Sequence, residues 1–488
     1  MNDISKSVRH IMTVFLICFV GMISYIAYFQ VFEAPEIASD SNNVRLWAKR
    51  NEVLRGTIYD RDGNALTSST KIDKISQKRE YLQGNLFAHV LGYVDPAYGI
   101  TGLEASFDEE LTKSNVLATD LRSLFKDFDI DKFIEARKDS EREKIGNSLI
   151  TTLDTELQKV ASNALGDRKG SVVALNPKTG EILAMVSKPT YNPNDLKSVM
   201  EYANSGNDKN ATLLNRALDG KYPPGSTFKT ITLASTLQND PTALTRTFND
   251  NGKITFADGS YLPNAGGAAY GQIDLKKAFQ VSSNVAFGEL AMELGNEKLR
   301  TTAEDFGFNK RIPAIGVDIG KSEFPRLESY EIGSIARSGI GQSSILATPM
   351  QMALVAATVA NDGVMMQPKL VNKVVDPEGN VVDKIQDKEL STVITTEDST
   401  TIKNYMKNIV DSNLSKWPSF RGTNAGGKTG TAEYNNPDGT EAIPHGWFIG
   451  LAPAENPQIA IAVIVENGGS GASSAAVVAS KVVKEALK

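Results

Sequence analysis

Two side chains three residues apart, Ser226 and Lys229, could form a nucleophile and its base in the stretch KYPPGSTFKTITLAS. The Pro-Pro-Gly run before Ser226 cannot lie inside a helix, whereas the residues after it can, so both side chains are expected on one face of a first helical turn. A serine hydroxyl is a weak nucleophile until a base removes its proton, and a lysine whose pKa is lowered by burial can be that base. The free N–H groups of a helix N-terminus would suit a developing oxyanion.

The Ser-x-x-Lys spacing arises easily by chance, so its surroundings decide its meaning. Ser68 and Ser123 begin the same pattern in SSTK and SLFK. We expect both matches to lie on solvent-exposed faces without a catalytic role. Only Ser226 follows a helix-start signal inside the part of the chain that is expected to fold.

A second polar pattern, Ser-x-Asn, occurs at Ser41, Ser205 and Ser282. Ser282-Ser283-Asn284 alone stands among apolar residues, in KKAFQVSSNVAFGELAMEL, where the trio would be buried at a helix end. Because a buried polar group without a partner is costly, this position favours a functional role.

The tripeptide Lys-Thr-Gly occurs twice, at Lys178 in NPKTGEI and at Lys428 in GGKTGTAE. The first copy follows Asn-Pro and lies between two strand-like runs, which predicts a hairpin turn with Lys178 pointing to water. The second follows two glycines that would let a ligand approach the backbone, and it precedes an expected strand.

In chain order, Ser226-Thr-Phe-Lys229, Ser282-Ser-Asn284 and Lys428-Thr-Gly430 resemble the signature of the penicillin-binding proteins, among the serine penicilloyl transferases and β-lactamases. TTLDTELQ, GSVVALNPKTGEILAMVSKPTYNPN, GIGQSSILATPMQMA and HGWFIGLAP are also similar to that family. RGTIYDRDGNAL and YGITGLEASFDEEL resemble the N-terminal pedestal of its class B members. The resemblance covers most of the chain after residue 50.

The resemblance implies a D,D-transpeptidase that cross-links peptidoglycan and that β-lactams acylate. Ser226 would attack the D-Ala-D-Ala carbonyl of a stem peptide and release D-Ala, and an amine from a neighbouring stem would resolve the acyl-enzyme; a D,D-carboxypeptidase side activity is compatible with this chemistry. By the same analogy Lys229 is the base, Ser282 and Lys428 relay a proton to the leaving amine, and Asn284 holds the substrate amide.

The family analogy also assigns the residues beside Lys428. Thr429 and Thr431, on either side of Gly430, would bind the terminal carboxylate of the substrate. The backbone N–H groups of Ser226 and Thr431 would form the oxyanion hole. The analogy implies no cofactor and no metal.

The segments around these motifs predict an α+β fold, an antiparallel sheet packed between helices. GSVVALNPKTGEILAMVSKP and GWFIGLAPAENPQIAIAVIVENGG each predict two strands around a turn, and SSAAVVASKVVKEALK predicts an amphipathic helix. ATPMQMALVAATVANDG predicts a buried helix with Thr348 as N-cap, Gln351 completing a capping box and Gly363 at its end.

The N-terminal part predicts a membrane anchor. Residues 11–32 contain no charge, and at 1.5 Å per residue they reach about 33 Å, enough to cross a bilayer. Lys6 and Arg9 precede the span and Glu33 and Glu36 follow it, which predicts a cytoplasmic tail at 1–10 and an extracytoplasmic remainder. A cleaved signal peptide is the alternative, but the apolar run is long and lacks a small-residue cleavage site.

Between the anchor and the catalytic domain we expect a pedestal at 33–148, with the transpeptidase domain at 149–488. RGTIYDRDGNALTSS predicts a hairpin around Asp62-Gly63, and LEASFDEELTKS and LRSLFKDFDIDKFIEARKDSEREK predict charged helices. The pedestal is short for the glycosyltransferase that class A members carry. By family analogy a class B enzyme works beside a SEDS-type glycosyltransferase and other wall-synthesis membrane proteins, on glycan derived from lipid II. The role in elongation, division or sporulation is left open.

Composition and motif content bear on other classes of function. With 41% hydrophobic and 23% charged residues and a formal net charge of −6, the chain lacks the basic balance typical of nucleic-acid binding. Cys18 and three scattered histidines offer no zinc-type cluster. A Ser-His-Asp hydrolase is disfavoured because there is no Gly-x-Ser-x-Gly elbow and His445 is the only histidine expected in the folded part, packed beside the sheet. The remaining alternatives are a β-lactam sensor, a membrane-anchored class D-like β-lactamase and a non-catalytic scaffold.

Overall fold

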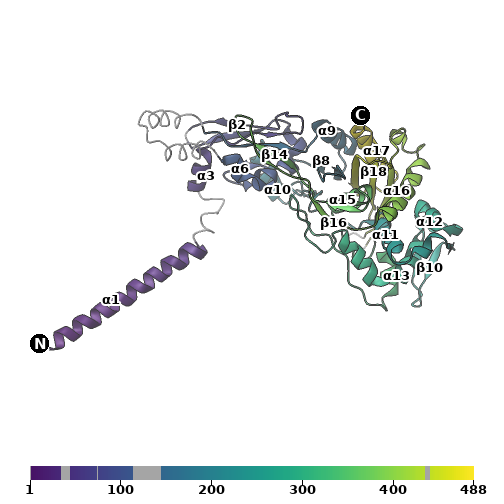
Figure 1. The fold of residues 1–488 in the computed structure, drawn as a ribbon, viewed down its shortest axis with the longest axis horizontal. Helices are drawn as coiled ribbons and strands as arrows, with labels where there is room; N and C mark the ends of the chain where they lie inside the picture. The colour runs from purple at the N-terminus through teal and green to yellow at the C-terminus, as the bar shows by residue number, and fades with distance from the viewer. Residues whose placement is uncertain (1, 34–43, 74, 114–143, 435–439) are drawn as a thin grey trace.

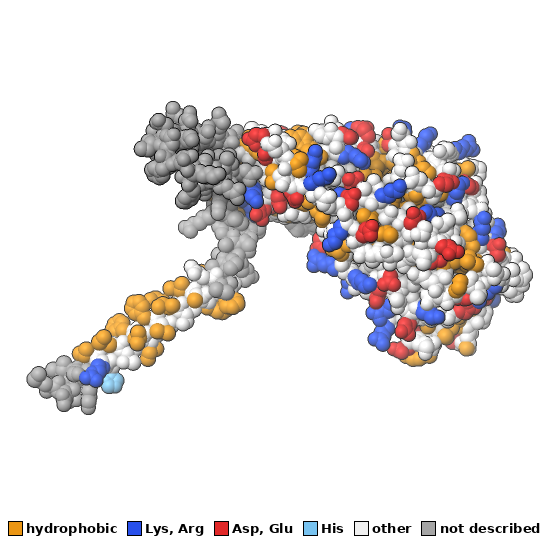
Figure 2. Space-filling view, in the orientation of Figure 1, with side chains coloured by type: hydrophobic (Ala, Val, Ile, Leu, Met, Phe, Trp, Pro, Cys, Tyr) orange, Lys and Arg blue, Asp and Glu red, His pale blue; other side chains and the backbone are white. Residues whose placement is uncertain are grey.

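A computed structural model describes residues 2–33, 44–73, 75–113, 144–434 and 440–488. At the N-terminus α1 (Asn2–Tyr28) continues into a π-helix, η1 (Phe29–Glu33). Within α1, Val8–Tyr28 is long and apolar enough to cross a membrane. Apolar side chains are exposed along its length (Figure 2). This agrees with the predicted anchor.

The pedestal is built from short elements around a small part of the core. Its strands are β1 (Ile58–Tyr59), β2 (Thr67–Lys71), β3 (Gln77–Tyr81), β4 (Val94–Asp95) and β5 (Gly99–Ile100), and its helices are α3 (Val44–Asn51), η2 (Gly84–Phe87), α4 (Ala88–Leu91), α5 (Gly102–Ser106) and α6 (Asp108–Thr112). The predicted hairpin is present but short: the Asp60 N–H donates to Asn64 O and the Leu66 N–H to Ile58 O around the turn at Asp62-Gly63. From Thr67 onward the chain pairs with β3. The helix expected over 121–144 falls on residues 114–143, outside the described ranges.

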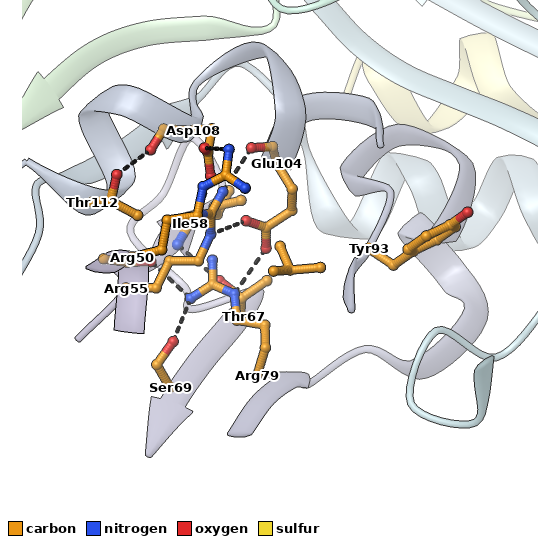
Figure 3. Close-up of polar contacts among 12 residues, drawn as sticks. Arg50, Arg55, Ile58, Thr67, Ser69, Arg79, Tyr93, Glu104, Asp108 and Thr112 are labelled. Atoms are coloured by element: carbon orange, nitrogen blue, oxygen red, sulfur yellow. Dashed lines mark hydrogen bonds and ion pairs between the residues drawn. The ribbon is translucent and has the colours of Figure 1, made fainter. Parts of the chain in front are cut away.

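A cluster of paired charges lies in the interior of the pedestal (Figure 3). Glu104 is fully buried and accepts from Arg55 Nε at 2.6 Å and from Arg79 Nε at 2.8 Å. Arg55 Nη1 also contacts Asp108 Oδ1 at 2.5 Å, and Arg50 contacts the other oxygen of Asp108. Burial alone would raise the pKa of Glu104, but Arg79 and Arg55 outweigh burial and hold that pKa below its usual value. The carboxylate therefore stays charged inside the protein.

The catalytic domain is organised on one antiparallel sheet (Figure 1). Its strands, in spatial order, are β17 (Gly426–Ala432), β18 (His445–Ala452), β19 (Ile459–Val465), β7 (Gly170–Leu175) and β8 (Ile182–Lys188). Every residue of β18 and β19 is buried, so both faces of the sheet are covered. The helices α9 (Thr155–Leu165) and α17 (Ala475–Ala486) pack together on one face, and α15 (Pro349–Ala360) packs on the other. The predicted sheet, with strands from both ends of the domain, is confirmed.

The predicted N-terminal capping of the buried helix α15 was wrong in one detail. All twelve residues are buried, and the Thr348 side chain accepts from the Gln351 N–H as an N-cap. Gln351 does not complete a capping box, because its side-chain amide donates to Phe306 O and the Thr348 N–H donates to Ser322 Oγ. In a helix buried on all sides, tertiary partners replace the local one.

A second group of elements lies beside the end of the sheet that carries β17. Its helices are η3 (Gly225–Phe228), α11 (Lys229–Asn239), η4 (Pro241–Leu244), α12 (Leu275–Val281), α13 (Asn284–Asp305), α14 (Ile332–Ser338) and α16 (Thr396–Asp411), and its strands are β9 (Thr247–Asp250), β10 (Lys253–Thr255), β11 (Tyr261–Pro263) and β12 (Gly271–Asp274). Here α11 packs on α13, while α16 packs on β17. These contacts bring the three motif-bearing segments together.

A mixed sheet joins the pedestal to the catalytic domain. β6 (Ser148–Thr151) pairs in parallel with β1 and antiparallel with β14 (Val371–Val375), which pairs with β15 (Val381–Lys384). The remaining elements are α10 (Leu196–Asn204), η5 (Ala265–Gly267), β13 (Val364–Met366), β16 (Glu389–Thr392) and η6 (Pro418–Phe420). Strands from both parts therefore share one set of backbone hydrogen bonds.

Candidate active site

Ser226 lies in the 3-10 turn η3, directly before α11 begins at Lys229. Gly225 has φ of 53°, and a Cβ there would lie 2.5 Å from the backbone oxygen of Thr431. Glycine is therefore required for the turn to approach strand β17 so closely. Ser226 is partly exposed, whereas Lys229 is fully buried, so the hydroxyl can meet a substrate while the amine is kept from water.

The turn before Ser226 is fixed from the sheet. The buried indole of Trp447, on β18, donates to Pro223 O at 3.0 Å, and Thr227 Oγ1 donates to Pro224 O at 2.7 Å. Both prolines thus have their carbonyl oxygens occupied, which fixes the position of the hydroxyl-bearing residue that follows.

Ser282, Ser283 and Asn284 form the junction between α12 and α13. Ser282 is left-handed, with φ of 59° and ψ of 42°, and Ser283 caps α13 by accepting from the Ala286 N–H. A left-handed serine is uncommon and persists where surrounding contacts hold it. The predicted helix-end position of this trio is confirmed, but its predicted burial holds only for Ser283, since Ser282 and Asn284 are partly exposed.

Two buried lysines converge on this junction. Lys229 Nζ donates to Ser282 O at 2.6 Å, to Asn284 Oδ1 at 2.7 Å and to Ser282 Oγ at 3.2 Å. Lys428 Nζ lies 2.9 Å from the same Ser282 Oγ and 3.1 Å from Thr429 O. The Ser282 hydroxyl therefore bridges the two amines, and a proton could pass between them through it.

The surroundings of the two amines lower both pKa values, with burial as the main cause. Burial, and then the nearby positive charge of Lys428, lower the pKa of Lys229 well below its ordinary value, and Asp250 opposes this only in part. Burial lowers the pKa of Lys428 to about 7. The rings of Phe287 and Phe279 lie 5.7 and 5.6 Å from the two nitrogens and form apolar walls. Both shifts favour the neutral amine, and at Lys229 the neighbouring cation adds to the effect of burial.

Lys428 lies within strand β17, which begins at Gly426. The two glycines ahead of it have a different role from the predicted one. A Cβ on Gly427 would lie 2.1 Å from the Phe448 ring, and one on Gly426 would lie 3.0 Å from the backbone of Lys407 on α16. Gly426 and Gly427 therefore make room for packing and not for a ligand.

The three residues after Lys428, which the family analogy assigns to substrate binding, continue strand β17. Thr429 and Thr431 alternate with Gly430, so both threonines share one face of the strand and are partly exposed. A Cβ on Gly430 would lie 3.0 Å from Pro224 O, on the side of the Ser226 turn. The structure thus places the strand beside the turn and leaves two hydroxyls accessible.

The other Lys-Thr-Gly copy takes no part in this cluster. Lys178 is exposed in the turn between β7 and β8, and its Nζ donates to Asn456 Oδ1 at 2.6 Å. The predicted hairpin turn is confirmed. The other chance matches are Ser68 and Lys71 on β2, Ser205 at the end of α10, and Ser41 and Ser123, which lie outside the described residues.

The histidine prediction was wrong in part. His89 is also in the folded part, buried in the pedestal, with its ring edge-on to Tyr191. Burial lowers the pKa of His89 to about 4, so its ring is neutral. His445 is buried within β18, where it stacks on Tyr434 and its Nδ1 accepts from the Asn467 N–H. Its role here is packing.

Comparisons with known proteins show the family and the fold. The family model described as penicillin binding protein transpeptidase domain matches residues 170–488, and penicillin binding protein A dimerisation domain matches 55–127. Peptidoglycan D,D-transpeptidase PbpA of Mycolicibacterium smegmatis is 32% identical, over 96% of this chain and 95% of its own length. MrdA of Acinetobacter baumannii is 30% identical over 81% of this chain and 64% of its own. Penicillin-binding protein A from M. tuberculosis, solved as a ceftriaxone acyl-enzyme complex, aligns with a TM-score of 0.80 at 29% identity, covering 90% of this chain and 100% of that one.

Proposed function

This chain belongs to the penicillin-binding protein transpeptidase family, and we propose that it is a peptidoglycan D,D-transpeptidase whose acyl-enzyme forms on Ser226. The observation that carries the proposal is the Lys229–Ser282–Lys428 hydrogen-bond chain between two buried lysines, which starts one helical turn from the partly exposed Ser226. The same serine would be acylated by β-lactams.

In the first half-reaction, Ser226 Oγ attacks the D-Ala-D-Ala carbonyl carbon while its proton passes to the neutral Lys229 amine. The N–H groups of Ser226 and Thr431 stabilise the oxyanion. As the peptide bond breaks, the leaving D-Ala amine takes a proton relayed from Lys428 through Ser282. An amine from a second stem peptide then attacks the acyl carbon, and Ser226 recovers its proton.

The remaining side chains hold the substrate. Asn284 would bind the peptide amide, since its side chain already reaches the lysine beside the nucleophile. Lys428, Thr429 and Thr431 would bind the terminal carboxylate, with buried Gly430 keeping the strand close to the Ser226 turn. The pair of hydroxyls and the adjacent cation suit a carboxylate.

Two alternatives are less well supported. A β-lactam sensor or a class D-like β-lactamase shares the three motifs, but the dimerisation-domain match at 55–127 and the identity to PbpA over 96% of this chain favour a transpeptidase. A scaffold would not need the complete polar cluster that Lys229, Ser282, Asn284 and Lys428 form.

The setting at the membrane is part of the proposal. Lys6 and Arg9 lie at the N-terminal end of α1, before the uncharged stretch at 11–32, which favours a cytoplasmic N-terminus and an extracytoplasmic catalytic domain. We place the boundary between pedestal and catalytic domain at 148–149, where the chain enters β6. A SEDS-type glycosyltransferase would supply the glycan strand, and the purified chain should therefore polymerise no lipid II; chain growth by this protein alone would contradict that partnership.

The test of the nucleophile is Ser226→Ala. The variant should fold with an unchanged thermal midpoint and take up no fluorescent penicillin, because no other serine combines the buried lysine with the turn at the start of α11. Labelling equal to that of the unmodified protein would place the nucleophile elsewhere and would contradict the mechanism.

A further inference from the structure

A buried carboxylate outside the three motifs holds the Ser282–Asn284 junction. Asp250, the last residue of β9, is fully buried. Its Oδ2 accepts from Ser283 Oγ at 2.5 Å, and its Oδ1 accepts from Asn264 Nδ2 at 2.7 Å and from the Gly252 N–H at 2.9 Å. The three donors come from different parts of the chain, so the carboxylate connects the end of β9, the residue after β11 and the Ser282–Asn284 junction.

Asn264 carries the connection on to the catalytic asparagine. Its Oδ1 accepts from the N–H groups of Asn284 at 2.7 Å and Val285 at 3.2 Å. Next to it, Pro263 O accepts from Asn284 Nδ2 at 2.7 Å. The Asn284 side chain therefore has its amide nitrogen fixed, and its Oδ1 is turned to Lys229.

These contacts explain how an uncommon backbone conformation is maintained. Ser282 is left-handed, a conformation that costs a non-glycine residue free energy unless neighbours enforce it. The residues on its C-terminal side, Ser283 and Asn284, are the ones bound to Asp250 and Asn264. In this conformation both Ser282 O and Ser282 Oγ contact the amine of Lys229.

We propose that Asp250 is a positioning residue for acyl transfer: through Ser283 and Asn264 it holds the Ser282–Asn284 junction in the conformation that binds both lysines. The inference rests on the proposed function, since the junction matters only if Ser226 is the nucleophile. Asp250 touches no reacting atom in this scheme and acts through other residues.

Charge gives this role a signature that a purely structural residue would not have. The charged groups that act on Lys229 are Lys428 on β17, which lowers its pKa, and Asp250 on β9, which raises it. Glu289, half-buried on α13, also interacts with Asp250. Acylation needs neutral Lys229, so its rate falls as pH drops through that pKa. Removing the negative charge of Asp250 would lower the pKa and move the acid limb of the rate profile to lower pH.

The experiment measures acylation by a chromogenic β-lactam across pH, with the full-length protein in detergent. Asp250→Asn should acylate about 10- to 100-fold more slowly at neutral pH, because small misplacements of catalytic groups cost that much. Its acid limb should move to lower pH. Ser283→Ala removes one tie but leaves the charge, so the rate should fall while the acid limb stays in place.

The matched control is Asp60→Asn in the pedestal. Asp60 is likewise buried, and its carboxylate accepts from Thr155 Oγ1 at 2.6 Å and from Asn64 Nδ2 at 2.9 Å. It should lose stability without a change in acylation rate or pH profile per folded molecule.

Two results would overturn the inference. One is an Asp250→Asn rate within twofold of the unmodified protein. The other is a slowed variant with an unmoved acid limb and only the stability loss of Asp60→Asn. If Asp250→Asn does not fold, an unslowed Ser283→Ala overturns it. In each case loss of labelling in Ser226→Ala shows that the proposed function itself still stands.

Discussion

The pedestal and the catalytic cluster both bury charged side chains, but they arrange them in opposite ways. In the pedestal, Glu104 is contacted by Arg55 and Arg79, with every pair of opposite sign (Figure 3). In the catalytic cluster, Lys229 and Lys428 share one serine hydroxyl, and both are basic. In the first arrangement each charge has a partner of opposite sign, whereas in the second the charge of Lys428 disfavours protonation of Lys229.

The pKa shifts follow this difference. The arginines keep the pKa of Glu104 low despite its burial, so its charge is stable across the physiological range. Burial and the neighbouring cation lower the pKa of Lys229, and burial brings that of Lys428 to about 7. Buried charges of opposite sign form a fixed structural ion cluster. Two buried basic groups side by side can instead exchange a proton near neutral pH.

The largest effect is expected from Lys229→Met, which keeps the side-chain length but removes the base. Loss of a general base costs about 10²–10⁴ in rate. Two buried acceptors, Ser282 O and Asn284 Oδ1, lose a donor, so stability should fall as well, but by less than when an ion cluster is broken. Stopped-flow acylation and thermal unfolding of the same sample measure both; acylation within tenfold of the parent would contradict the assignment.

Glu104→Gln should show the reverse pattern. Breaking a buried ion pair costs about 3–5 kcal/mol, because the remaining charges are left uncompensated. The loss should appear in denaturant unfolding, while acylation per folded molecule stays within about twofold. Glu80→Gln is the control, since Glu80 pairs with Lys78 at the surface and such pairs contribute about 0–1 kcal/mol. Equal losses for the two variants would show that the pedestal cluster is not a structural ion cluster.

The sequence predicted the residues of the three motifs, but not the residues that hold those motifs in place. Ser226, Lys229, Ser282 and Lys428 were found because each motif is short and its neighbours carry local signals, such as the helix start and the apolar run. Asp250 is linked to Ser283 across 33 residues and to Asn264 across 14, with no shared local pattern. Such contacts are set by tertiary structure.

The errors have the same origin. The capping box at Gln351 and the ligand-access role of Gly426 and Gly427 were read from local rules. In the folded chain, Gln351 meets Phe306 and Gly427 faces the Phe448 ring. Elements with long apolar runs, such as β19 and α15, were predicted correctly because these runs indicate burial on all sides.

Lys428→Ala tests the second buried lysine. Losing one preorganised electrostatic contact commonly costs 10²–10³ in rate, about 2.7–4 kcal/mol, so acylation should slow at least about a hundredfold with little change in the thermal midpoint. In the unmodified protein, Lys428 loses its charge as pH rises through about 7. Acylation should therefore decline above that pH, and this alkaline limb should be absent from the variant.

The smallest effect separates the two Lys-Thr-Gly copies. Lys178 is exposed in a hairpin turn, and its side chain donates to the side chain of another exposed residue, Asn456, so Lys178→Ala should change stability by less than about 0.5 kcal/mol. Its acylation rate should stay within about twofold of the parent at every pH, with the alkaline limb intact. The two copies differ in burial and in their partners, not in sequence. If Lys178→Ala were the slow variant, or if both were equally slow, burial beside a second lysine would not be what makes this tripeptide catalytic.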